Sequence, residues 1–84
     1  MEGKKEVTPE RVTSMIQRIE NIRDEVLSLV ASCPAPGIGT LMERASDHIE
    51  KARAFLEENR LQNAEAEARI ALNMYNRIKE ICSI

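Results

Sequence analysis

The residues best suited to chemistry in this 84-residue chain are its one histidine, His48, and its two cysteines, Cys33 and Cys82. Histidine exchanges protons near neutral pH, and two cysteines can form a disulfide or contribute to a metal site. No side chain stands at a recognisable catalytic spacing from His48, and no glycine-rich phosphate loop or metal-ligand cluster is present. We therefore expect no enzyme activity, no cofactor and no bound metal.

His48 belongs to a seven-residue pattern between residues 41 and 59. Each unit starts with two core-type positions followed by Glu, and His48 takes the place that Leu41 and Phe55 hold in the neighbouring units. This position predicts an imidazole packed at the edge of the core, with one nitrogen hydrogen-bonded to a helix partner or to water. The alternative is a binding site for a small molecule or a regulatory ligand that uses His48 or the two cysteines.

Cys33 and Cys82 follow the apolar patterns of the first and the last predicted helix, so both should lie at the same end of an up-down-up bundle. We expect two buried, reduced thiols. A disulfide or redox contact is the alternative, and a metal site ranks below it. Zinc needs four ligands, whereas His48 should lie about 12 Å along its helix from that end.

Composition predicts one small domain with an aliphatic core. The chain is 43% hydrophobic but only 2% aromatic, and 84 residues are too few for two cores. We expect a polar tail over residues 1–7 and a single domain over residues 8–84.

Charge and hydropathy exclude several classes of partner. The net charge is -2 with both signs interleaved, so most charged side chains should form surface ion pairs. Nucleic-acid binding would need Arg60, Arg69, Arg77 and Lys79 on one surface, and their spacing scatters them. No apolar run suits a membrane span or a secretory signal, so we expect no membrane partner. Two cysteines in such a chain favour a reducing, cytoplasmic location.

Helix signals divide the chain into three. Thr8 followed by Pro9 is typical of a helix start, and a helix is predicted over residues 9–31. The prolines and glycines of residues 34–39 interrupt it. Thr40 and Glu43 form a capping box that predicts a second helix over residues 40–58. Asn59 suits a left-handed helix end, and a third helix should cover residues 62–83.

Each predicted helix has one apolar face, and together they predict an all-α, antiparallel, up-down-up three-helix bundle. The first half of the third helix is rich in alanine. Small residues let two helix backbones approach closely, so this half should lie tightly against the second helix near Ala52 and Phe55.

A second apolar stripe on the third helix is the strongest sign of function. It consists of Ile70, Met74, Ile81 and Ile84, with Arg77 inside it, and Leu27 on the first helix also falls outside its core pattern. If exposed, these residues form a candidate interaction surface. They then predict a small protein-interaction module, either a homo-oligomer such as a dimer or one bound to a helical partner. Alternatively, the third helix lies centrally and buries both stripes.

Glu43, Glu50 and Glu57 form an acidic column on the second helix. Seven residues separate successive carboxylates by about 10 Å along the axis, too far for them to share one cation. A solvated face is expected.

Residues 48–76 resemble one tetratricopeptide helix pair. Ala52, Phe55, Leu61, Ala64 and Ala71 stand at its packing positions, whereas Ala68 replaces its usual aromatic residue. Asn59 replaces its turn glycine and the closing proline is absent. The resemblance covers about a third of the chain, and a solenoid needs about three such repeats. It implies peptide or protein binding without catalysis.

Overall fold

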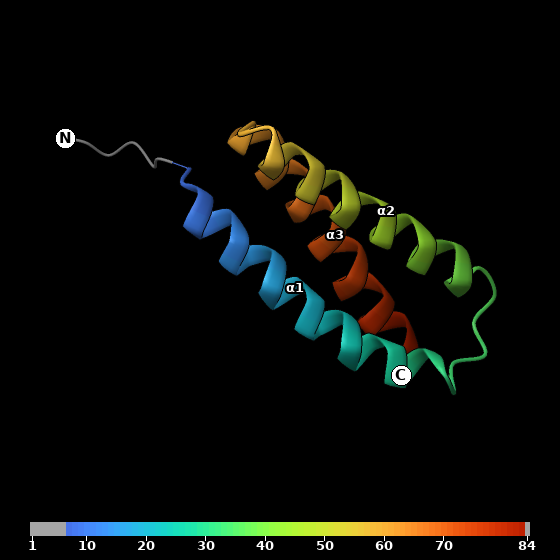
Figure 1. Cartoon of the computed structure of the whole chain (residues 1–84). Helices are drawn as coiled ribbons and strands as arrows, with labels where there is room; N and C mark the ends of the chain where they lie inside the picture. Colours follow the sequence, from blue (N-terminus) through green and yellow to red (C-terminus); the bar gives the residue numbers. More distant parts are fainter. Residues whose placement is uncertain (1–6, 84) are drawn as a thin grey trace.

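The protein is a bundle of three helices: α1 (Pro9–Val30), α2 (Ile38–Glu57) and α3 (Leu61–Cys82). The structure, a computed structural model, describes residues 7–83. Consecutive helices run in opposite directions, and α1 and α3 end at the same end of the bundle (Figure 1). The predicted all-α, up-down-up three-helix bundle is confirmed. The predicted tail, apart from Val7, lies outside the described residues.

The first helix begins where its sequence predicts. The Thr8 Oγ1 atom accepts a hydrogen bond of 3.2 Å from the Arg11 backbone N–H, and Pro9 occupies the first turn. This bond satisfies one of the backbone donors that a helix start leaves free. The helix ends at Val30, one residue before the predicted end.

The second helix begins earlier than predicted, and the expected capping box at Thr40 is not its start. Gly37 is the N-terminal capping residue, with φ of 82° and no side-chain hydrogen bond. Glycine adopts this left-handed conformation without a steric penalty. Ile38 is only 4% exposed, and burying an isoleucine contributes about 1.5–3 kcal/mol. We attribute the earlier start to these two residues.

The turn between α2 and α3 has the geometry of a Schellman motif. Asn59 has φ of 62°, as predicted for a left-handed helix end. Its N–H donates to the Leu56 carbonyl at 3.0 Å, and the Arg60 N–H donates to the Phe55 carbonyl at 2.8 Å. These bonds satisfy carbonyls that the end of α2 would otherwise leave free, so α2 and α3 are two helices.

The core is aliphatic and depends on alanine where α2 meets α3. α3 contacts both other helices, most extensively α2, whereas α1 and α2 share only a small contact. Five alanines of α2 and α3 are fully buried: Ala45, Ala52, Ala64, Ala68 and Ala71. The predicted close approach of these two helices is confirmed. Larger side chains fill the core towards α1, among them Ile19, Val26 and Ile78.

Tyr75 is the largest fully buried side chain, and its hydroxyl group has no hydrogen-bond partner among the described residues. Burial raises the pKa of this hydroxyl above its ordinary value of 10.0, and the positive charge of Arg23 partly opposes the shift. Both observations describe a polar group held in an apolar environment, which carries a free-energy cost.

We expect Tyr75→Phe to raise the free energy of unfolding by about 1 kcal/mol, because it removes an unsatisfied buried donor. Above about pH 10 the unfolded chain loses this proton first, so wild-type stability falls by up to about 1.4 kcal/mol per pH unit. Urea unfolding of both proteins at about pH 7 and about pH 11 measures these effects. A variant less stable than the wild type at neutral pH would show that the hydroxyl is hydrogen-bonded.

Candidate interaction surface

The predicted second stripe of α3 is largely exposed along the described part of the helix. We call Ile70, Met74, Arg77 and Ile81 the α3 stripe. Ile70 is 42% exposed, Ile81 is 37% exposed and Arg77 is exposed, whereas Met74 is half-buried against the core. Ile84 lies outside the described residues. The central packing of α3 therefore does not bury both of its apolar faces.

The α3 stripe lies on the flank of α3 that borders α2. Glu67 of α3 pairs with His48 of α2, and Ile70, Met74 and Ile81 follow Glu67 by three, seven and fourteen residues. This spacing keeps all of them on one flank of a helix. The opposite flank faces α1, because Lys79 pairs with Glu25 at 3.1 Å.

Leu27 does not join the α3 stripe. It is 45% exposed and follows Glu20 by seven residues on α1. Glu20 pairs with Arg53 of α2, so Leu27 lies on the flank of α1 that borders α2. The residues of the predicted surface thus occupy two separate faces of the bundle, with α2 between them.

The surface between α1 and α2 is incompletely filled. Arg23 lies four residues after Ile19 and three residues before Val26, both of which are buried in the core. This spacing puts Arg23 on the core side of α1, but its side chain is exposed. A hollow of about 140 Å³ also opens between the two helices, lined by Thr13, Ile16, Gln17, Glu20, Arg53 and Leu56. We call this face, together with Leu27, the α1/α2 groove. The sequence analysis did not identify Arg23 as part of a surface. Its spacing of four and three residues from the core residues Ile19 and Val26 could have indicated this position.

Charged side chains of opposite sign lie on the two flanks of α2. Glu50 and Glu57 stand three residues before and four residues after Arg53, the partner of Glu20 on α1. Glu43, seven residues before Glu50, continues this column. The acidic column therefore lies on the side of α2 that is nearer to the α1/α2 groove.

The basic residues Arg44 and Lys51 stand four residues before and three residues after His48, the partner of Glu67 on α3. They therefore border the α3 stripe. Within residues 7–83, the five charged residues of these two columns and Arg77 form no ion pairs with one another or with other side chains. These six are exceptions to the expectation that most charged side chains form surface ion pairs.

His48 packs at the α2–α3 edge, as its position in the repeat predicted. Its ring is half-buried, and its Nδ1 atom lies 2.5 Å from the Glu67 Oε1 atom. With an ionised Glu67, the Nδ1–H group donates to the carboxylate. The imidazole nitrogen that faces α3 is therefore used in holding two helices together.

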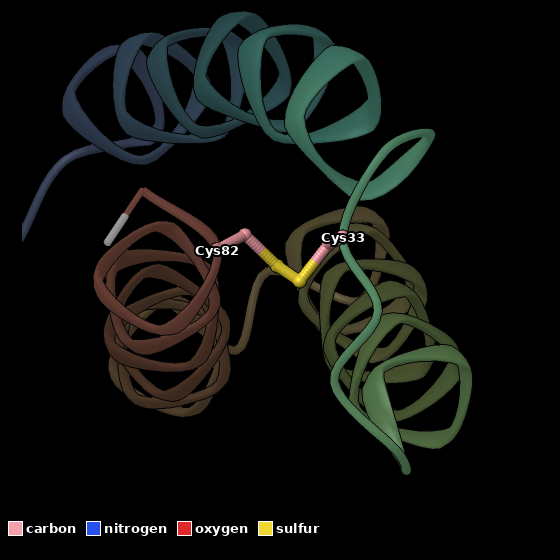
Figure 2. The surroundings of a disulfide bond; sticks show 2 residues. All are labelled: Cys33 and Cys82. Carbon is pink, nitrogen blue, oxygen red and sulfur yellow. A yellow bond between two sulfur atoms is a disulfide. The ribbon is translucent and has the colours of Figure 1, made fainter.

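Cys33 and Cys82 form a disulfide, so the expectation of two reduced thiols is wrong. Their Cα atoms are 5.3 Å apart. Figure 2 shows the bond crossing from the end of α3 to the segment that follows α1. The predicted common location of the two cysteines at one end of the bundle is confirmed, and this proximity allows the bond. No free cysteine remains among the described residues.

The part of the chain that the structure describes shows few other features of a site. No three acidic, cysteine or histidine side chains of residues 7–83 gather as metal ligands would. None of its helices has both the length and the hydropathy needed to cross a membrane. Two further hollows lie along α1 and near the end of α3, and neither they nor the hollow between α1 and α2 includes His48 or a cysteine.

Comparison of this chain with protein-family models, with curated proteins and with solved structures found no match.

Proposed function

We propose that this protein is a small, non-catalytic interaction module that associates with itself through the α3 stripe. The observation that carries the proposal is the exposure of Ile70 and Ile81, 42% and 37%, on one flank of one helix. Exposed aliphatic side chains that cluster on a small domain are typical of a protein contact. Transferring both side chains from water to an interface would favour association by the hydrophobic effect.

The rest of the surface favours this role over ligand binding. The alternative function, binding of a small molecule or regulatory ligand, required His48 or the two cysteines as its site. His48 is hydrogen-bonded to Glu67, and the two cysteines are bonded to each other. Among the cations considered for nucleic-acid binding, Arg69 pairs with Glu65 and Lys79 with Glu25. The resemblance of residues 48–76 to a tetratricopeptide helix pair also implies protein binding.

The disulfide has a consequence for the cellular compartment that we propose for this protein. The expectation of a cytoplasmic location depended on reduced thiols. Disulfides persist in oxidising environments and are rare in the cytosol of most organisms. With Cys33 and Cys82 joined, our proposal places the working protein in an oxidising compartment.

The test of self-association is the double variant Ile70→Glu/Ile81→Glu. We expect the weight-average mass of the wild type to rise above 9.5 kDa with concentration in sedimentation equilibrium. The variant should remain at the monomer mass, because two buried, unpaired carboxylates would each cost several kcal/mol in the interface. Circular dichroism should show unchanged helicity, since both side chains are exposed.

A matched control is Gln62→Glu/Asn73→Glu, which adds two carboxylates to α3 at exposed positions outside the α3 stripe. We expect it to associate like the wild type. A wild type that stays monomeric at every concentration would contradict the proposal, and so would association that survives in Ile70→Glu/Ile81→Glu.

A further inference from the structure

We infer that self-association is head-to-tail: the α3 stripe of one copy docks into the α1/α2 groove of the next copy. This inference rests on the proposed self-association through α3 and adds the surface that receives the stripe. The two faces lie on opposite sides of α2, so one copy can use both at once. Their charges and their exposed aliphatic side chains determine the assignment.

A symmetric α3–α3 dimer would bring like charges together. A twofold contact places the same patch of both copies face to face. Arg77 lies inside the α3 stripe, and Arg44 and Lys51 border it from α2. None of these three has an ion-pair partner among residues 7–83. Twofold pairing would therefore oppose two sets of three unpaired cations, which disfavours it.

The α1/α2 groove offers a hollow to the side chains of a docked helix, with Ile16 and Leu56 as the apolar residues of its lining. α1 and α2 share only a small contact, and a hollow of about 140 Å³ opens between them beside Ile16 and Leu56. Leu27, 45% exposed, adds one apolar side chain about two turns beyond Glu20 on the same flank of α1. Helices pack by placing the side chains of one into the depression between others. The flank of α3 that carries Ile70 and Ile81 supplies such side chains.

The groove is bordered by negative charge, whereas the α3 stripe carries and is bordered by positive charge. By their spacing from Arg53, Glu43, Glu50 and Glu57 form its outer rim on α2, outside the residues that line the hollow. All three are exposed, and none is ion-paired with another described residue. On α1, Arg23 lies within the groove and forms no ion pair with another described residue, so its cation offsets one of these three carboxylates. Docking the α3 stripe here therefore brings three cations that have no partner among residues 7–83 to a face on which such carboxylates outnumber cations by three to one. Complementary charges of this kind select the partner and its orientation.

Head-to-tail contacts have a consequence for the size of the assembly. Each copy that binds by its α3 stripe still presents a free groove, so the assembly continues until it closes into a ring or grows as a filament. The mass should therefore rise past that of a dimer as concentration increases. Because exposed charges take part, high salt should weaken association.

Two charge-reversed variants test the arrangement. Arg44→Glu/Lys51→Glu reverses the rim of the α3 stripe, and Glu43→Lys/Glu50→Lys reverses the rim of the groove. All four side chains are exposed and unpaired within the described residues, so both variants should keep wild-type helicity. We expect each variant alone to lose association and to sediment at 9.5 kDa. An equimolar mixture should regain it, because the reversed stripe of one fits the reversed groove of the other.

The outcomes separate this inference from the function on which it rests. Association that survives in Glu43→Lys/Glu50→Lys but disappears in Ile70→Glu/Ile81→Glu overturns the head-to-tail arrangement and leaves self-association intact. A wild-type mass that stops at twice 9.5 kDa does the same. A wild type that remains monomeric overturns both. Loss of association in Glu43→Lys/Glu50→Lys alone, followed by rescue in the mixture, is the result that no symmetric dimer through α3 would produce, because such a dimer does not use the groove.

Discussion

Reduction of the Cys33–Cys82 disulfide should lower the free energy of unfolding by about 4 kcal/mol. The bond closes a loop with a sequence separation of 49 residues, and the chain-entropy model assigns about 4 kcal/mol to a loop of this length. A domain of this size has little stability in reserve. We therefore expect a reducing agent to lower the midpoint of thermal unfolding by about 20 °C. Circular dichroism with and without a dithiol reductant measures it.

The matched control is Cys33→Ser/Cys82→Ser, which cannot form the bond. It should unfold near the midpoint of the reduced wild type and should not respond to the reductant. Thiol titration of the unreduced protein should find no free thiol. Two titratable thiols, or an unfolding midpoint that reduction leaves unchanged, would contradict this prediction.

Ala71→Leu should lower the free energy of unfolding by about 3 kcal/mol, the upper end of the usual cost of overpacking a core. Ala71 is fully buried on α3 and follows Glu67, the partner of His48 on α2, by four residues. It therefore lies on the side of α3 that makes the extensive contact with α2. The added carbon atoms of leucine have no space there unless the two helices move apart. Urea unfolding of the variant and the wild type gives the difference.

Ala66→Leu provides the comparison, because Ala66 lies on the same helix but is exposed. The helix propensities of alanine and leucine are close. We therefore expect Ala66→Leu to change stability by less than about 0.5 kcal/mol. Equal effects of the two substitutions would mean that the α2–α3 contact tolerates larger residues, against the close packing of its alanines.

Local signals were sufficient for the start of α1 and the end of α2. Thr8, Pro9 and Asn59 act through backbone bonds within a few residues, so their roles could be predicted without knowledge of the rest of the chain. The start of α2 could not be predicted in this way. It depends on whether Ile38 finds a place in the core, and that place is formed by other helices.

The candidate surface was only partly predictable for the same reason. Helical spacing identified the α3 stripe, because residues three, four and seven apart share a flank whatever surrounds the helix. The separation of Leu27 from it depends on which flank of α1 faces α2, and the Glu20–Arg53 pair reveals this only in three dimensions. Seven-residue spacing likewise located the carboxylates of α2 but not the surface they border.

By itself, the sequence determined three amphipathic helices, an aliphatic core with alanine between α2 and α3, and a second apolar stripe on α3. Each of these follows from residue type and spacing within one helix or one turn. The tertiary structure alone decided that Cys33 and Cys82 are joined and that the acidic and basic columns of α2, which form no ion pairs within residues 7–83, border two different surfaces. Both depend on distances between residues far apart in the chain, and only the packing of the three helices sets those distances.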